Sequence, residues 1–459
     1  MPAEDLNEIP TPSGIKTVRH SEPTAKKPVT AGAIYSLLAM GLYQFAESML
    51  YPTLAPEILH LSSDYLLVGL IYALPQLCSV LFAFLWGYIS DRRKTRLGVL
   101  RPLLFAGTLL FLVYPFASPW ILILLRTLQM AFFSGIILLN ALLSEKFPEK
   151  KGYAIGVLAM VGAVGSTLGA WSSGFILTYF RSYFFFVCLG FDLAAFIFLY
   201  LSTEEDAAIL SSQDTENGRI NDRNSSDTIS ASPVKDGEQY GEKDTLKESK
   251  FIPFSRNNNL WLLALSAFFL GLADWIVFSL FSVYIDHLVL NSIGAGWVER
   301  LRGLIIGSAG VSGIVFSLLT GKWIDKKGRK TTLLITIASY FIMWEALGIF
   351  DNLIVALIVW LTPFWWVFNI CTSTMAADFT TPKERGRGMA LITTLNGFGA
   401  VTGAVLAGVL KARLDYPTVF IIAGIFTIPS FIAALFVKSK NGRSENAKEN
   451  KTSKKTLTH

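Results

Sequence analysis

Five charged residues lie well inside long apolar stretches of the chain. They are Glu47, Arg126, Asp192, Asp274 and Glu345. An unpaired charge at the centre of a bilayer costs about 2.5–3.5 kcal/mol on insertion scales, so each residue needs a partner, water or a neutral protonation state. An acid held in this way can carry a proton or bind a cation, and a buried arginine can bind an anionic group. These residues are the first candidates for function.

The apolar stretches around these charges are long enough to cross a membrane. Of the 459 residues, 52% are hydrophobic and only 16% are charged, against about 25% charged residues in soluble domains. Windows of about 20 residues predict twelve spans with short connections. The spans lie near residues 31–54, 66–89, 100–117, 119–143, 153–180, 183–202, 258–285, 303–323, 331–350, 352–377, 388–410 and 417–437. The expected fold class is an all-α membrane protein with twelve transmembrane helices, and a soluble enzyme is excluded.

Three polar segments flank and divide the spans. Residues 1–30 form a tail, residues 203–256 a linker too polar to fold alone, and residues 438–459 a basic tail. Lys and Arg cluster in the connections after the second, fourth, eighth and tenth spans, which predicts a multi-pass protein of the cell membrane with both termini and the linker in the cytoplasm. The net charge of +6 follows from these clusters, so no nucleic-acid partner is expected.

A repeat divides the chain into two halves, residues 31–202 and 257–437. The segment from Gly87 to Arg96 recurs from Gly321 to Lys330, an offset of 234. A second block repeats at the same offset: Pro148, Gly152, Gly165, Gly169 and Gly174 match Pro382, Gly386, Gly399, Gly403 and Gly408. Two pseudo-symmetric six-helix bundles are therefore expected, with a binding site between them.

The repeated segment resembles the Gly-x-x-x-Asp-(Arg/Lys)-x-Gly-(Arg/Lys)-(Arg/Lys) motif of the major facilitator superfamily (MFS). The first copy has Gly87, Asp91, Arg92 and Arg96, with Lys94 in place of the second glycine; the second copy has Gly321, Asp325, Lys326, Gly328, Arg329 and Lys330. Charge pairs between the aspartates and the bases could hold helix ends together. Glu145 and Asp378, near the ends of the fourth and tenth spans, could join these pairs, so all these residues are expected to act in gating.

The resemblance implies that the first, fourth, seventh and tenth spans line a central cavity. We expect an ion pair of Glu47 with Arg126, alongside Tyr43, Gln44 and Gln129. On the other side of the cavity we expect Asp274, with Trp365, Trp366 and Asn369. Asp192 and Glu345 fall on spans that the resemblance makes peripheral, where structural pairing or snorkelling to the interface is the expectation.

These features predict a secondary transporter that alternates access to one site. The leading interpretation is proton-coupled efflux of a lipophilic or cationic compound, with Glu47 or Asp274 taking up the proton. One alternative is an uptake symporter or uniporter for a polar metabolite, whose anionic group Arg126 would bind; another is a transporter-like receptor or scaffold without flux. The fifth span contains Gly162, Gly165, Gly169 and Gly174, which resemble the antiporter segment of the family or simply allow tight packing.

The expected partners are a small-molecule substrate, protons and the lipid bilayer, and the protein is expected to be a monomer. No phosphate-binding loop of the Gly-x-x-x-x-Gly-Lys-Ser/Thr kind occurs in the sequence. The three cysteines, Cys78, Cys188 and Cys371, lie in apolar runs without metal-ligand spacing. Neither a cofactor nor a metal is expected.

Overall fold

The computed structural model describes residues 31–147, 151–202, 257–362, 364–381 and 384–438. The predicted N-terminal tail and linker, and the C-terminal tail beyond Lys438, lie outside the described residues. All the regular elements of the described chain are helices. The expected all-α membrane fold is confirmed.

The first half contains α1 to α7. The helices are α1 (Ala31–Ser62), α2 (Tyr65–Arg93), α3 (Leu97–Leu109), α4 (Pro119–Phe133), α5 (Leu138–Lys146), α6 (Lys151–Phe180) and α7 (Phe184–Leu201). Turns of 3-10 helix extend α3 at its C-terminal end. Another such turn joins α4 to α5, so α4 and α5 form one span. The first helix is longer than the sequence predicted, because its apolar window ends at residue 54 whereas the helix continues to Ser62.

The second half contains α9 to α15. The helices are α9 (Asn258–Ser292), α10 (Val298–Lys327), α11 (Arg329–Ile349), α12 (Leu353–Leu361), α13 (Phe364–Phe379), α14 (Arg385–Lys411) and α15 (Tyr416–Phe436). The predicted tenth span is broken, and α12 and α13 share it. The break comes at Thr362, which adopts extended backbone as expected for a residue that precedes a proline.

Nine helical segments of the described chain are long and apolar enough to cross a membrane. One of them, Tyr153–Leu201, contains both α6 and α7. Two long helices, α1 and α10, fall outside this set. Both nevertheless pack inside the bundle, each against α6, which brings the number of spans to the twelve expected.

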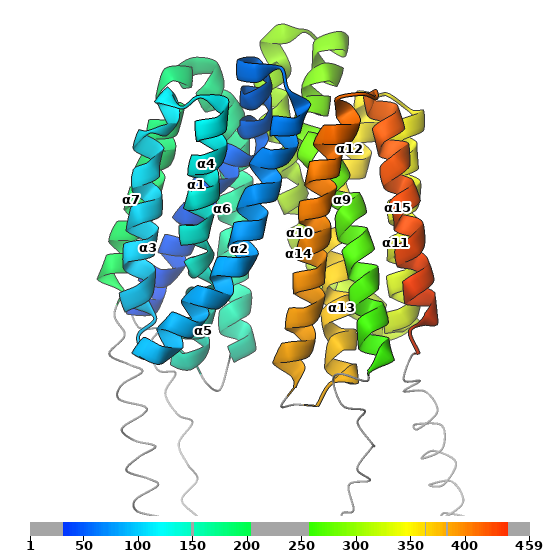
Figure 1. Cartoon of the computed structure of the whole chain (residues 1–459). Helices are drawn as coiled ribbons and strands as arrows, with labels where there is room; N and C mark the ends of the chain where they lie inside the picture. The colour runs from blue at the N-terminus through cyan, green and yellow to red at the C-terminus, as the bar shows by residue number, and fades with distance from the viewer. Residues whose placement is uncertain (1–30, 148–150, 203–256, 363, 382–383, 439–459) are drawn as a thin grey trace, which may run out of the picture.

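The two halves stand side by side as two helical bundles (Figure 1). They meet along α2 with α14 and along α6 with α10. We call the end that carries the α2–α3 and α10–α11 connections the motif end, and the other the opposite end. Because the spans alternate in direction, α1 begins and α15 ends at the motif end. The helices α2 and α14 lie close together at the opposite end and diverge toward the motif end (Figure 1).

Glycines bring the helices within each half into backbone contact. A Cβ atom on Gly165 of α6 would lie 2.2 Å from the carbonyl oxygen of Gly41 on α1, and one on Gly169 would lie 2.1 Å from that of Phe45. Their repeats on α14 make the same contacts with α9: a Cβ on Gly399 would lie 2.1 Å from the Phe268 oxygen, and one on Gly403 would lie 2.3 Å from the Leu272 oxygen. Small residues allow such close packing in membranes. The glycine-rich part of α6 therefore serves helix packing.

These contacts also align α1 with α9. The pairs Gly41 with Phe268 and Phe45 with Leu272 differ by 227 residues, whereas the rest of the repeat differs by 234. The second half thus has seven additional residues between its first two spans, where a 3-10 turn (Ala295–Trp297) lies between α9 and α10. Positions on α1 and α9 must be compared at an offset of 227.

Four more glycines seal the two halves together at the opposite end. A Cβ on Gly69 of α2 would lie 2.4 Å from the Ala404 oxygen of α14, and a Cβ on Gly303 of α10 would lie 2.7 Å from the Ala170 oxygen of α6. Gly408 and Gly174 complete the two contacts, which are related by the repeat offset of 234. By contrast, Gly87 near the motif end has no neighbouring atom within 4 Å.

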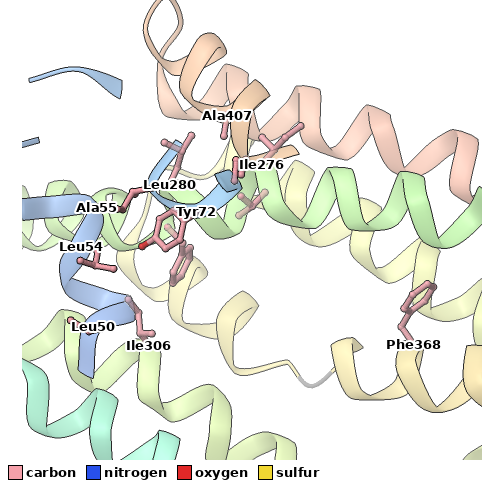
Figure 2. Packing of buried hydrophobic residues seen from close by; sticks show 14 of the residues in the cluster. Leu50, Leu54, Ala55, Tyr72, Ile276, Leu280, Ile306, Phe368 and Ala407 are labelled. Atoms are coloured by element: carbon pink, nitrogen blue, oxygen red, sulfur yellow. The ribbon is translucent and has the colours of Figure 1, made fainter. Parts of the chain in front are cut away.

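Buried apolar side chains reinforce this seal. Leu50, Leu54 and Tyr72 of the first half gather with Ile276 and Leu280 of α9 in one cluster (Figure 2). The hydroxyl group of Tyr51 donates a 2.9 Å hydrogen bond to the Phe278 oxygen across the two halves. Among the described residues, the side-chain hydrogen bonds that join the halves all lie toward the opposite end. The structure is therefore closed at the opposite end.

Candidate functional site

Glu47 on α1 and Arg126 on α4 form a bidentate ion pair. Arg126 Nη1 donates to Glu47 Oε1 at 2.9 Å, and Nη2 donates to Oε2 at 2.7 Å. Each residue is 9% exposed. The fork of an arginine matches the two oxygens of a carboxylate, which makes this the strongest common type of charged hydrogen bond. The pair that the sequence predicted is present and uses both oxygens of Glu47.

Polar and aromatic side chains fix the position of Arg126. Gln129 accepts hydrogen bonds from Arg126 Nη1 at 2.8 Å and from the Tyr114 hydroxyl at 2.7 Å, and its amide group donates to the Gly107 oxygen at 3.3 Å. Tyr43 is buried and packs edge-to-face on Phe133 with ring centroids 5.2 Å apart. The arginine is thus held on two sides by acceptors.

Gln44, also predicted to belong to the site, is half-buried on α1. Its Cγ atom would lie 3.5 Å from a Cβ atom on Gly162 of α6. The structure therefore places Gln44 at the packing interface of α1 with α6.

Asp274 on α9 has a different environment. The structure gives it no ion pair with any described residue, while the nearby Tyr51 and Tyr340 interact with it electrostatically. One turn along α9, the ring of Phe278 stacks on Tyr51 with centroids 4.3 Å apart. The same ring lies 4.8 Å from Trp275 and 5.9 Å from Trp360 on α12. Asp274 is an acid without a cation, next to a cluster of aromatic rings.

The repeat explains this difference. At the offset of 227, Asp274 is the counterpart of Glu47, and Phe278 is the counterpart of Tyr51. At the offset of 234, the counterpart of Arg126 is Trp360. Instead of donating to a carboxylate, Trp360 stacks on Phe281 with centroids 3.9 Å apart. The second half has kept the acid of the ion pair and replaced its cation with an aromatic ring.

A cavity of about 230 Å³ lies between α2, α13 and α14. Its lining is Gln76, Val80, Trp365, Phe368, Asn369, Thr372, Ser373, Met389, Ile392, Thr393, Asn396 and Gly397. Trp365 and Asn369 thus line a cavity between the two halves. Asn396 connects this cavity to α9. Its side-chain amide donates to the Ala267 oxygen at 3.0 Å, and a Cβ on Gly271, one turn before Asp274, would lie against Asn396.

Two other residues singled out in the sequence lie away from this cavity. Trp366, predicted to belong to the site, packs with its indole against α10, where Nε1 would lie 2.0 Å from a Cβ on Gly313, and it is not among the residues that line the cavity between α2, α13 and α14. The expectation that Asp192 is paired or reaches the interface is wrong. Asp192 is 0% exposed, and both carboxylate oxygens lack a hydrogen-bond partner among the described residues. The sequence placed it on a peripheral span and gave no sign of this burial.

The two motif loops form matching ion pairs at the motif end. Arg96 pairs with Asp91 and donates to Glu145 from Nη2 at 2.8 Å. In the second copy Arg329 pairs with Asp378. The hydrogen bonds that Arg96 donates to Glu145 and to Asp91 raise the pKa of Arg96 above its ordinary value, so this arginine stays charged at neutral pH. The side chain of Asp325, and residue Gly321, lie in a part of α10 whose side chains are not described.

The backbone at the substituted glycine keeps the positive φ of the motif. Gly328 has a φ of 86° and Lys94 a φ of 54°, and glycine favours positive φ because it lacks a Cβ atom. The ψ angles differ, at 147° for Gly328 and 28° for Lys94, so Lys94 alone adopts the left-handed helical conformation. Arg92 is exposed at the end of α2, and no described contact involves it.

We expect the Asp91→Asn substitution to slow the exchange between conformations by about five-fold or less. Asp91 is exposed, and an exposed ion pair contributes at most about 1 kcal/mol. The rate can be measured by single-molecule energy transfer between dyes on Tyr88→Cys and Met389→Cys, two exposed positions near the motif end. Arg93→Gln, at an exposed base without a described contact, is the matched control. Equal slowing in both variants would contradict a specific role of Asp91.

Charged residues also join the halves at the opposite end. Arg181 donates to Glu57 of its own half at 2.7 Å and to Glu299 of the other half at 2.9 Å. A second cavity, of about 390 Å³, lies beside this cluster. Arg302, 4% exposed, pairs there with Asp286. These residues could not be picked out from the sequence, because they lie at span ends, where charges are common and no motif marks them.

The chain is similar in sequence to a known family and to several of its members. Residues 36–368 and 263–459 match the sequence model described as Major Facilitator Superfamily. The multi-drug resistance efflux pump PmrA homolog of Lactococcus lactis subsp. lactis (strain IL1403) is 24% identical over 369 residues, which cover 79% of this chain and 83% of that protein. Multidrug resistance protein MdtG of Proteus mirabilis (strain HI4320) is 23% identical over 369 residues, which cover 77% and 81%.

Solved structures show the same fold. The nucleoside transporter NupG superposes with a TM-score of 0.67 at 13% identity, over 89% of this chain and 99% of that structure. A D-xylose-proton symporter superposes with a TM-score of 0.65 at 16% identity, over 89% and 96%. At these identities the likeness extends to the fold alone.

Proposed function

Because the chain belongs to the Major Facilitator Superfamily, and is therefore a multi-pass membrane transporter of a small molecule, we propose that it exports lipophilic organic cations in exchange for protons. The observation that carries the proposal is Asp274, an acid whose counterpart pairs with an arginine but which has no such partner itself. A bound organic cation would supply the missing charge. The multidrug names of the relatives from Lactococcus lactis and Proteus mirabilis support this class of substrate.

The surroundings of Asp274 suit a cation with apolar substituents. Tyr51, which interacts with Asp274 electrostatically, belongs to a connected group of rings with Trp275, Phe278 and Trp360. A cation over an aromatic face gains about 0.5–2 kcal/mol, and more when water is excluded. The cavity of mixed polar and apolar lining that Asn396 connects to α9 would give access to Asp274.

The orientation in the cell membrane follows from the basic loops. Lys and Arg cluster at the motif end, so this end and both termini belong in the cytoplasm in our proposal. The structure, which is closed at the opposite end, would then be the conformation that takes up substrate from the cytoplasm. The protein is proposed to work as a monomer, since each chain contains both halves of the site.

We expect Asp274→Asn to reduce transport of an organic cation by about ten- to a hundred-fold, because a hydrogen bond to a charged group contributes about 1.5–3 kcal/mol. The probe is radiolabelled tetraphenylphosphonium, added outside proteoliposomes that contain the full chain and have an acidic interior. Valinomycin and potassium clamp the membrane potential, so that accumulation reports the pH gradient alone.

Two controls make the result specific. Glu345→Gln removes another acid of a membrane span and should leave accumulation unchanged. Glu345 lies on α11, and its side chain contacts α15 near Gly424. Asp274→Glu keeps the charge and should retain part of the activity. Full accumulation by Asp274→Asn, or accumulation driven by an acidic exterior, would contradict the proposal; the second result would identify a symporter.

A further inference from the structure

Asp192 is a buried acid of the first half whose role the exchange reaction does not yet explain. It lies on α7, is 0% exposed, and both of its oxygens are buried without a hydrogen-bond partner among the described residues. Removing an ionised carboxylate from water costs several kcal/mol even after relaxation, unless ion pairing and hydrogen bonds compensate. The uncharged acid has a far smaller cost. In this conformation Asp192 therefore holds a proton.

The groups that face Asp192 offer it no free cation. Glu47 and Tyr43 on α1, Arg126 on α4 and Cys188 one turn earlier on α7 are close enough to interact with it electrostatically. Arg126 is the only cation among them, and it already donates two hydrogen bonds to Glu47 and one to Gln129. On α3, Arg101 donates to the backbone oxygens of residues 199, 200 and 202, about two turns away along α7.

Glu47 is a poor carrier of protons in this arrangement. Both of its oxygens accept from Arg126, and protonation would break at least one of these bonds and leave the arginine without its counter-charge. An arginine cannot release a proton in compensation, since the guanidinium group is not deprotonated in proteins. Glu47 should therefore remain ionised throughout the cycle, contrary to the expectation from the sequence.

We propose that Asp192 is the carboxyl group that carries the coupling proton, an inference that rests on the proposed exchange of cations for protons. The carboxylic acid of Asp192 releases its proton to water when the region around the Glu47–Arg126 pair hydrates, and the resulting carboxylate competes with Glu47 for Arg126. Reprotonation from the other side of the membrane restores the uncharged acid and the bidentate pair. No other reactant is needed.

Infrared spectroscopy tests the protonation directly. In the purified full-length protein at neutral pH, we expect a C=O stretching band of an uncharged carboxylic acid that shifts on exchange into D₂O. Asp192→Asn should remove this band, whereas Glu47→Gln should leave it. Persistence of the band in Asp192→Asn would overturn the proposal, and this readout requires no substrate.

Transport separates coupling from binding. In the tetraphenylphosphonium assay, Asp192→Asn should lose at least ten-fold in accumulation driven by the pH gradient, but should still exchange labelled for unlabelled cation at equal pH. Asp192→Glu should recover part of the driven accumulation, which would exclude misfolding as the cause. Full pH-driven accumulation by Asp192→Asn would overturn the assignment. Failure of the wild-type protein to accumulate the cation would instead contradict the proposed function, while the infrared result would still decide the state of Asp192.

Discussion

Substitution of Glu47 by leucine is expected to lower the free energy of unfolding by about 3–5 kcal/mol, the range for removing one partner of a buried ion pair. The variant leaves Arg126, 9% exposed, without its counter-charge in an apolar bundle. Unfolding can be followed by far-ultraviolet circular dichroism during titration of dodecylmaltoside micelles with dodecyl sulfate. Transport should be lost as well.

The double variant Glu47→Leu/Arg126→Met provides the decisive comparison. With both charges removed, much of the lost stability should return, because two well-packed apolar side chains need no counter-charge. Glu345→Leu, at an acid with no described ion pair, should cost less than about 1 kcal/mol, the range of a partly exposed charge. If the double variant is as unstable as Glu47→Leu, loss of packing rather than the unpaired arginine is the cause.

The second large effect concerns the glycine seal. The double variant Gly69→Leu/Gly303→Leu should open the opposite end. The new Cβ at residue 69 would lie 2.4 Å, and that at residue 303 would lie 2.7 Å, from a backbone oxygen of the other half. Overpacking of this kind costs about 1–3 kcal/mol per site. Across two sites, this shifts the equilibrium between conformations by roughly thirty-fold or more, at about 1.4 kcal/mol for each factor of ten.

Distances between spin labels measure this shift. Labels on Leu61→Cys and Ile293→Cys, which are exposed near the opposite end in different halves, should move apart. Labels on Tyr88→Cys and Met389→Cys near the motif end should approach each other. Both pairs require Cys78, Cys188 and Cys371 to be replaced first. Gly190→Leu is the control, since Gly190 is exposed on α7 with no atom within 4 Å, and unchanged distances in the double variant would show that the seal tolerates side chains.

Much of the fold could be predicted from the sequence, because hydrocarbon thickness sets the length of a span and loop charge sets its direction. The pairing of Glu47 with Arg126 could be predicted as well, since both lie at similar depth on helices that the resemblance placed around the cavity. These inferences depend on quantities that one sequence contains: hydropathy, charge position and the repeat.

The relation between Glu47 and Asp274 could not be found in this way. The repeat was recognised in loops and glycines at an offset of 234, and at that offset Glu47 aligns with Phe281. Only the backbone contacts of Gly165 and Gly399 show that α1 and α9 align at 227. The burial of Asp192 escaped prediction for a related reason, because hydropathy does not tell which side of a peripheral helix faces its neighbours. For the same reason, the sequence could not predict that the indole of Trp366 packs against α10.

The exchange of an arginine for Trp360 also bears on the energy source of the proposed cycle. Glu47 and Arg126 cancel each other. In the step that carries the proton, Asp192 is uncharged and Asp274 is empty, so the site has a net charge of about −1. In the step that carries a monovalent cation, Asp274 is neutralised and Asp192 has released its proton, so the net charge is again about −1. Moving one elementary charge across a membrane potential involves about 2.3 kcal/mol per 100 mV, but the two steps move the same charge in opposite directions and the work cancels. Over a whole cycle the membrane potential therefore neither drives nor opposes the exchange, and the pH difference alone drives accumulation of the cation.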